Sequence, residues 1–162
     1  MLSQDRLKQV FKYCPETGLF TRILSTASNV NVGDISRCLD KKGYVVIRID
    51  GRLYKAHRLA WLYMTGSWPT GELDHKNTIR NDNRFTNLRE CSRQQNLRNT
   101  NISKKSTTGF KGVSLSKNKK SFRAYATVMG KQINLGTYPD IVSANNARSE
   151  FAKTNFKEFY RE

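Results

Sequence analysis

The sequence predicts an α+β protein built from two domains. The spacing of hydrophobic residues alternates along the chain between a helical period and a period of two, which indicates both helices and half-buried strands. Residues 100–108 are almost entirely Asn, Ser, Thr and Lys, a composition typical of a linker. The 162 residues provide enough chain for two small domains. We therefore expect domains at residues 1–99 and 109–162, joined by a basic linker at residues 100–108.

The N-terminal elements are predicted from spacing and turn residues. Leu7, Val10, Phe11 and Cys14 recur at helical spacing after Ser3, a suitable N-cap. A turn at residues 15–18 should end this helix. The next expected elements are strands at residues 19–24 and 43–49, a two-residue Asp50-Gly51 hairpin leading into residues 52–54, a helix from about His57 to Thr65, and a loop at residues 66–71.

The C-terminal domain is predicted to be a three-stranded antiparallel sheet covered by one helix. Strands are expected at residues 111–116, 121–128 and 132–135. The second strand alternates strictly, with Phe122, Ala124, Ala126 and Val128 on one face. The third strand adds Ile133 and Leu135 to that face. After Pro139-Asp140, apolar residues return at helical spacing as Ala144, Ala147, Phe151 and Phe156. The opposite, polar face of the sheet then has no partner within the domain.

The charge distribution indicates a polyanionic partner. The formal net charge is +16 and the pI is about 10.1. DNA, RNA or an anionic membrane surface could attract such a chain, or the charge could serve solubility alone. No apolar run is long enough to span a bilayer and the first residues have no signal-peptide core, which favours nucleic acid. No acidic residue lies between Glu90 and Asp140, so positive charge continues from the first domain through the linker.

Cys14, Cys38 and Cys91 lie far apart and have no CxxC spacing. An odd number of such cysteines favours free thiols over a disulfide framework or a zinc ribbon.

Residues 72–99 carry the most informative chemistry in the chain. Leu73-Asp74-His75 and Asn87-Leu88-Arg89 are expected to be short strands joined by an Asn-rich loop. Ser92 and Gln95 form a capping box, which places Asn96 in the first turns of a helix beginning near Arg93. A carboxylate and an amide oxygen are ligands that suit Mg²⁺, and a neutral His beside them can act as a general base. These are the groups that phosphodiester hydrolysis requires.

This segment resembles the ββα-metal (HNH) nuclease motif, in the branch found in phage and intron-encoded homing endonucleases. The resemblance extends upstream to residues 16–20, Gly43-Tyr44 and residues 56–61. It implies that His75 is the general base, that Asp74 and Asn96 hold the metal, and that Asn87 holds the loop and orients His75. Because Asn96 stands where many HNH enzymes have His, Mg²⁺ or Mn²⁺ is expected rather than Zn²⁺ or Ni²⁺.

The C-terminal region, from Gly109-Phe110-Lys111-Gly112 through Gly136-Thr137-Tyr138 to Ala144–Ala147, resembles an AP2 DNA-binding domain. That resemblance implies a three-stranded sheet lying in the major groove of double-stranded DNA. It departs from the plant examples, which have Arg or Trp where Ser114, Gln132 and Asn134 stand, so it does not indicate a target sequence. The residues expected to bind DNA are Lys111, Ser114, Lys119, Arg123, Tyr125, Thr127, Lys131, Gln132 and Asn134, together with Arg84 or Arg89 near the scissile phosphate.

The sequence thus predicts a site-recognising, metal-dependent DNA endonuclease, a phage- or intron-encoded protein acting on intracellular DNA in the cytoplasm. It would have no membrane or small-molecule partner. The principal alternative is a non-catalytic DNA-binding regulator with a relic nuclease fold, although a relic would be expected to lose His75 or one of the two metal ligands. An RNA-binding protein is a third reading, for which the sequence offers no base-stacking motif. His57, the other histidine, is expected to be a core or capping residue rather than a second base.

Overall fold

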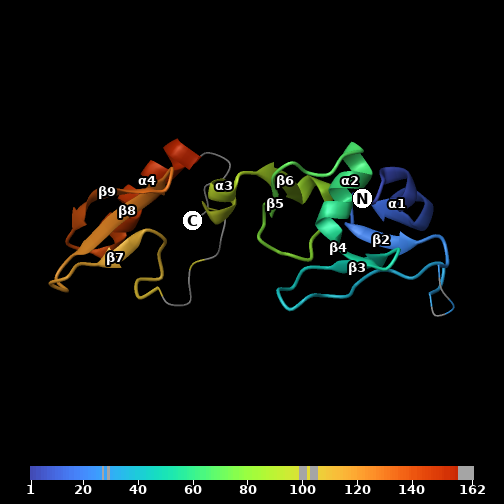
Figure 1. The fold of residues 1–162 in the computed structure, drawn as a ribbon. Coiled ribbons are helices and arrows are strands. Elements are labelled where there is room, and N and C mark those ends of the chain that lie inside the picture. The colour runs from blue at the N-terminus through green and yellow to red at the C-terminus, as the bar shows by residue number, and fades with distance from the viewer. Residues whose placement is uncertain (27, 29, 99–101, 103–105, 157–162) are drawn as a thin grey trace. The chain divides into compact units, whose positions relative to one another are not determined.

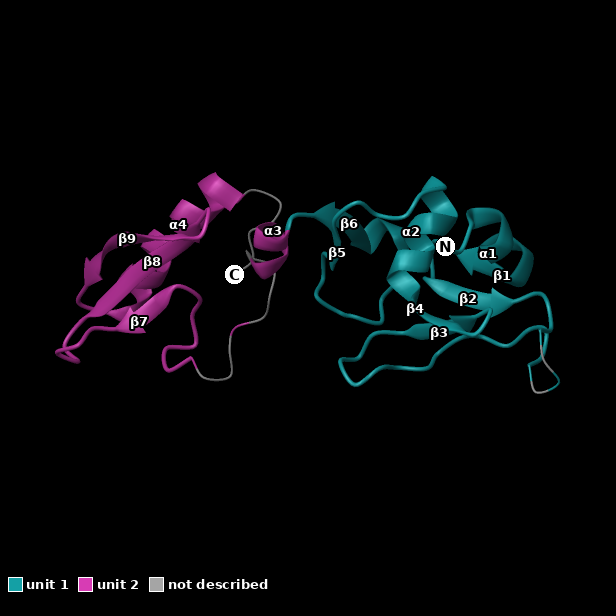
Figure 2. Ribbon diagram, in the orientation of Figure 1, with its two compact units in different colours: residues 1–92 teal, residues 93–162 magenta. Residues whose placement is uncertain are grey.

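A computed structural model describes residues 1–162 except residues 27, 29, 99–101, 103–105 and 157–162. The protein is α+β, with small antiparallel sheets and helices following one another along the chain (Figure 1). It divides into two compact units, Met1–Ser92 and Arg93–Glu162 (Figure 2). The expected boundary at residues 99 and 100 stays a prediction, because much of the expected linker lies outside the described residues.

The first unit is a series of hairpins and helices around one core. Its elements are α1 (Gln4–Val10), β1 (Phe11–Cys14), β2 (Leu19–Arg22), β3 (Val46–Ile49), β4 (Arg52–Lys55), α2 (Ala56–Thr65), β5 (Glu72–His75), the 3-10 helix η1 (Phe85–Asn87) and β6 (Leu88–Cys91). The strands pair as β1–β2, β3–β4 and β5–β6, each pair antiparallel. The expected Asp50-Gly51 turn joins β3 to β4, with both residues at positive φ (47° and 79°) as a type I′ hairpin requires.

The first helix is shorter than its spacing predicted. Ser3 does cap it, since its side chain accepts a hydrogen bond from the Arg6 amide. Phe11 and Cys14, however, belong to strand β1 and pair with Arg22 and Leu19 of β2. In this strand Phe11 and Tyr13 are buried on either side of the exposed Lys12. This alternation of buried and exposed residues favours an extended strand over a continued helix.

The core of the first unit joins its beginning to its end. Leu7, Val10 and Phe20 from the first 22 residues pack in the same cluster as Leu59 of α2 and Leu88 of β6. All five side chains are at most 4% exposed. Strand β6, which follows the loop after His75, is therefore anchored in the core that the N-terminal helix and hairpins build.

The second unit contains α3 (Arg93–Arg98), β7 (Val113–Leu115), β8 (Phe122–Val128), β9 (Lys131–Tyr138) and α4 (Ile141–Phe156). Strands β7, β8 and β9 form an antiparallel sheet in that order, and α4 packs on one face of it (Figure 1). Ala124 and Ala126 are buried beneath the helix, which confirms the face expected from the alternation. Asp140 caps α4 by accepting hydrogen bonds from the amide and hydroxyl of Ser143.

Two details of this unit differ from expectation. Arg148 and Ala152 of α4 are buried, whereas Ala147 and Phe151 are half-buried, so the helix is rotated from the predicted face. Strand β9 is longer than predicted and carries a bulge: Ala124 pairs with Gly136 but Tyr125 pairs with Asn134. Gly136, at a φ of 122°, provides the backbone conformation of this irregularity.

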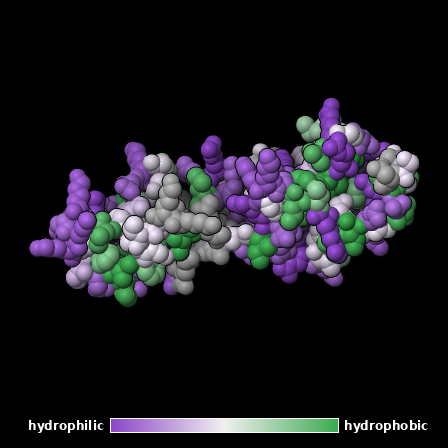
Figure 3. All heavy atoms as spheres, turned by 90° about the horizontal axis from the view of Figure 1, so that it is seen from below, coloured by the Kyte–Doolittle hydropathy of each residue, from purple (hydrophilic) through white to green (hydrophobic). Residues whose placement is uncertain are grey.

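Hydrophilic residues cover most of the visible surface of each unit, with small hydrophobic groups scattered among them (Figure 3). Among the described residues, no helix is long and apolar enough to cross a membrane. Cys14, Cys38 and Cys91 are free thiols.

Candidate functional site

Asp74 and His75 are neighbours at the end of strand β5, which pairs with β6. The antiparallel register sets Asp74 opposite Arg89 and His75 opposite Leu88. Because Leu88 belongs to the core, the end of β5 is held against the interior, and Asp74 and His75 are only 6% and 4% exposed. The strand pair expected from the sequence is thus present, and Asp74 and His75 lie within it. Asn87, which was expected to begin the second strand, instead ends the 3-10 helix η1 before β6.

The Asp74 carboxylate forms a largely buried ion pair with Arg89. Oδ2 of Asp74 accepts hydrogen bonds from Nε of Arg89 at 3.0 Å and from Nη2 at 2.8 Å. The two side chains retain 7% and 11% exposure. Arg89 and Arg84 are the two arginines of which one was expected to contact a DNA phosphate. In the structure Nε and Nη2 of Arg89 are engaged by Asp74.

Asn87 ties together the loop that joins the two strands. Its Oδ1 accepts from the Asn77 amide at 3.0 Å, and its Nδ2 donates to Oδ1 of Asn77 at 3.0 Å and to the Asp82 carbonyl at 2.8 Å. Its own carbonyl accepts from the amide of Lys76, directly after His75. Asn87 therefore connects both ends of the loop with its middle.

Asp82 adds a second set of contacts within this loop. Its carboxylate accepts from Nδ2 of Asn77 at 2.6 Å and from Nε and Nη2 of Arg84 at 2.8 and 2.6 Å. These hydrogen bonds, that of Arg84 first, lower the pKa of Asp82 to about 2. Arg84, the second arginine expected near DNA, is half-exposed while it makes this ion pair.

The His75 ring is enclosed by polar and aromatic neighbours. Its Nε2 lies 3.3 Å from Oδ1 of Asn83, and its ring centroid lies 5.0 Å from that of His57 and 6.0 Å from that of Tyr44. Burial lowers the pKa of His75, while the Asn83 hydrogen bond and the Asp74 charge act in the opposite direction. A lowered pKa keeps the imidazole neutral near pH 7, the state that a general base requires.

His57 lies at the start of α2 and is buried. Burial, followed by the neighbouring His75, lowers its pKa to about 3. Its Nδ1 is buried without a hydrogen-bond partner among the residues that the structure describes. A histidine that stays neutral and enclosed agrees with the expected structural role, although its contact with the His75 ring was not anticipated.

Four residues at this site had no chemistry assigned to them from the sequence. Asn83 contacts His75, and the Tyr44 ring lies close to both histidines. Lys55 and Arg80 place their cationic groups 4.2 and 5.3 Å from the Tyr44 ring centroid. These contacts join segments around residues 44, 55 and 80, so spacing within residues 72–99 gives no signal for them.

The expected metal ligands lie in different units. Asp74 is in the first unit, whereas Asn96 is half-buried in α3 of the second. A carboxylate oxygen and an amide oxygen match the preference of Mg²⁺ for hard donors. Within the described part of the chain, no group of three or more His, Cys, Asp or Glu side chains is arranged to hold a metal ion.

The polar face of the C-terminal sheet carries the side chains expected to contact DNA. Strand register aligns Ser114 with Arg123, Tyr125 with Asn134, and Thr127 with Gln132. Thr137 pairs with Arg123 on the same face, and sequence analysis missed it because β9 was predicted to end at residue 135. Lys119 and Lys131 are exposed near the ends of this sheet, and Lys111 is half-buried before β7.

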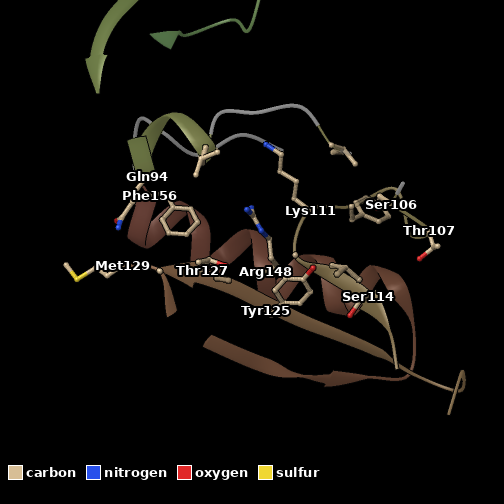
Figure 4. Close-up of a pocket in the computed structure, with 17 residues that line it drawn as sticks. Gln94, Ser106, Thr107, Lys111, Ser114, Tyr125, Thr127, Met129, Arg148 and Phe156 are labelled. Atoms are coloured by element: carbon tan, nitrogen blue, oxygen red, sulfur yellow. The ribbon is translucent and has the colours of Figure 1, made fainter. Parts of the chain in front are cut away.

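A hollow of about 690 Å³ lies within the second unit, where β8 extends beyond its pairing with β7. Lys111, Tyr125, Arg148 and Phe156 line it (Figure 4). Its wall also includes Ser114 and Thr127, so it adjoins the polar face of the sheet. None of the residues expected to perform catalysis contributes to this wall.

Residues 54–98 match the sequence model of the HNH endonuclease family. The matched segment runs from β4 through α3 and includes Asp74, His75, Asn87 and Asn96. This match supports a nuclease function for the segment.

Among solved structures, the chain is similar to one describing DNA binding and cleavage by the HNH homing endonuclease I-HmuI. The sequences are 22% identical, the similarity covers 89% of this chain and 75% of that one, and the TM-score is 0.42. None of the curated proteins matches the chain.

Proposed function

We propose that this protein is a site-recognising, metal-dependent DNA endonuclease. The observation that carries the proposal is the buried Asp74-His75 pair within a segment that matches the HNH endonuclease family. The histidine is neutral near pH 7, it is held at the end of a strand, and it lies beside a carboxylate. The high positive charge of the chain supports double-stranded DNA as the substrate.

In this proposal His75 accepts a proton from the attacking water, and Asp74 and Asn96 hold Mg²⁺ or Mn²⁺ at the scissile phosphate. The bound ion would supply charge neutralisation at the phosphate and at the leaving oxygen. Asn87 keeps the intervening loop closed, and burial of the His75 ring limits the number of orientations that it can adopt. The family likeness implies products with a 5′-phosphate and a 3′-hydroxyl.

The C-terminal unit is proposed to select the site. In this proposal the three-stranded sheet acts as an AP2-like domain, and its polar face enters the major groove. Tyr125 and Asn134 pair in the middle row of this face, and Arg123 lies in the next row between Ser114 and Thr137; these side chains would read base edges. Lys119 and Lys131 lie near the ends of the sheet, where phosphates would be contacted. Arg123 and Asn134 are exposed and available for such contacts.

The decisive experiment incubates supercoiled plasmid with the protein in Mg²⁺, Mn²⁺ or EDTA. Cleavage should require the metal, and His75→Ala should reduce its rate by about 10²- to 10⁴-fold while leaving DNA binding nearly intact. Arg123→Ala serves as the complementary variant, because it should weaken site binding and retain non-specific nicking. Cleavage at the wild-type rate by His75→Ala would refute the assignment of the base. Specific binding without any cleavage would instead support the non-catalytic regulator.

A further inference from the structure

Asn83 is the least exposed polar side chain in the described parts of the first unit. It is 2% exposed, although it lies in the loop between β5 and β6 rather than in a strand or helix. Burial of an amide is costly unless its oxygen and nitrogen are both satisfied. Its contacts therefore indicate what this side chain does.

Two contacts fix the orientation of the Asn83 amide. Nδ2 lies 3.3 Å from the carbonyl oxygen of Asn81, which can only accept, so the nitrogen must face that carbonyl. Oδ1 then faces Nε2 of His75, also at 3.3 Å. Because an amide oxygen cannot donate, Nε2 of His75 must carry the hydrogen. In a neutral imidazole the lone pair then resides on Nδ1, so the Asn83 amide determines which ring nitrogen is basic.

The N-terminal hairpin holds Asn83 in place. The hydroxyl of Tyr13 in β1 donates to the carbonyl of Asn83 at 2.7 Å, and the amide of Phe85 donates to the carbonyl of Pro15 at 3.0 Å. Tyr13 is itself 4% exposed and packs against Phe20 across the hairpin. The segment that carries Asn83 is therefore fixed to the β1–β2 hairpin by hydrogen bonds on both sides of Arg84.

The turn of this hairpin also lies directly against the loop. At Gly18 a Cβ atom would be 2.5 Å from the amide nitrogen of Arg84 and 2.5 Å from the carbonyl carbon of Asn83. Gly18 has a φ of 74°, which side chains other than glycine rarely adopt. The approach of the two backbones thus depends on glycine at this position. Tyr13, Pro15 and Gly18 all lie outside the segment that matches the HNH family.

We propose that Asn83 is a positioning residue for His75, and that Tyr13 of the N-terminal hairpin holds Asn83 in the orientation that makes Nδ1 of His75 the basic nitrogen. The catalytic use of the basic Nδ1 rests on the proposed nuclease function. The tautomer of the His75 ring does not depend on activity and can be measured separately.

Nuclear magnetic resonance of the full chain with ¹⁵N-labelled histidine tests the tautomer directly. At pH 8 both imidazoles should be neutral, and the ¹⁵N shifts distinguish a protonated from an unprotonated ring nitrogen. The wild-type His75 should show a protonated Nε2. Asn83→Ala should abolish this preference, whereas Asn83→Asp, which retains an oxygen acceptor, should keep it. Tyr13→Phe should weaken it.

Tyr63→Phe is the matched control. Tyr63 packs against Tyr13 and Phe20 in the same aromatic cluster, but its hydroxyl makes no hydrogen bond within the described residues. Its substitution should leave the His75 signals unchanged. Tryptophan fluorescence confirms that each variant is folded, and Asn83→Asp and Tyr13→Phe keep the test valid if Asn83→Ala does not fold.

Cleavage measurements on the same variants complete the test. Asn83→Ala should lower kcat by about 10- to 100-fold, a typical cost of removing the partner that orients a functional histidine, with little change in KM. Asn83→Asp should recover part of the loss. A wild-type His75 protonated on Nδ1, or a tautomer that Asn83→Ala does not alter, would overturn the proposal. If the tautomer depends on Asn83 but the wild-type protein cuts no DNA, the positioning role stands and the nuclease function fails.

Discussion

Breaking the Asp74–Arg89 ion pair is expected to cost far more stability than breaking the Asp82–Arg84 pair. The perturbation is the substitution of each arginine by methionine, which keeps most of the apolar stem and removes the charge. Arg89 is 11% exposed and its partner 7%, whereas Arg84 is 50% exposed and its partner 14%. The two pairs therefore differ in how readily water can replace the lost arginine.

The expected magnitudes follow from this difference. Removing one partner of a buried pair leaves an uncompensated charge and costs about 3–5 kcal/mol. An exposed pair contributes about 0–1 kcal/mol. Arg89→Met should thus lower the free energy of unfolding by at least about 2 kcal/mol more than Arg84→Met does. A further Asp74→Asn substitution should recover part of the loss, because it removes the stranded carboxylate.

Urea unfolding followed by tryptophan fluorescence measures this effect in the relevant unit. Both tryptophans of the chain, Trp61 and Trp68, lie in the first unit. Arg89→Met should lower the urea midpoint by at least about 1 M, given an m-value of about 1–3 kcal/mol per M. Equal, small losses in the two variants would refute the reasoning, since they would show that water reaches the Asp74 carboxylate.

Three further predictions concern pH, base reading and the division of labour between the units. His57 has a pKa of about 3 in the folded chain and near 6.5 when unfolded, so the unfolded chain binds more protons between these values and stability should fall as the pH falls from 6.5 to 3. His57→Phe should reduce the change in the free energy of unfolding with pH by up to about 1.4 kcal/mol per pH unit. Urea unfolding at pH 7, 6 and 5 measures this dependence, and a dependence equal to that of the wild type would contradict the prediction. Arg123→Ala should cost roughly 1–3 kcal/mol of binding and blur preference at one base, whereas Lys119→Ala should weaken binding to all sequences alike, and salt-titrated binding to cognate and scrambled DNA separates the two. A chain truncated near residue 101 should keep weak metal-dependent nicking without its preferred site, while a fragment from about Ser106 should bind that site without cutting. Footprinting that shows full site preference in the truncated nuclease would contradict the two-module account.

Local patterns predicted the elements whose residues also make their principal contacts locally. The Asp50-Gly51 dipeptide specified its hairpin because both residues adopt positive φ. The alternation of Phe122 through Val128 specified the buried face of β8 because α4 covers only one side of the sheet. Neither prediction needed information from a distant part of the chain.

The end of the first helix was predicted incorrectly because the sequence there fits two periods. Leu7, Val10, Phe11 and Cys14 match helical spacing, but Phe11 and Tyr13 also alternate around Lys12. Pairing with β2 and burial of both aromatic rings decided between them. Such a tertiary effect cannot be read from a single segment.

At the candidate site, too, the residues within one local motif were predicted, but their contacts with other segments were not. Asp74 and His75 were located by their strand and by the resemblance to a known motif. Their partners were not: Arg89 contacts Asp74 through strand register, and Asn83 contacts His75 through a loop of irregular structure. Tyr13 reaches the loop from 70 positions away, with no periodic signal to connect them.

The shared core of the first unit limits how this protein can be divided. The segment that matches the HNH family begins at residue 54, yet Leu59 and Leu88 within it are buried against Leu7, Val10 and Phe20. Excising the segment would expose these side chains, each worth about 1.5–3 kcal/mol when buried. Recombination between HNH-type proteins with this core would therefore fail at junctions inside the first unit. Any transplanted active site must bring the N-terminal helix and hairpins with it.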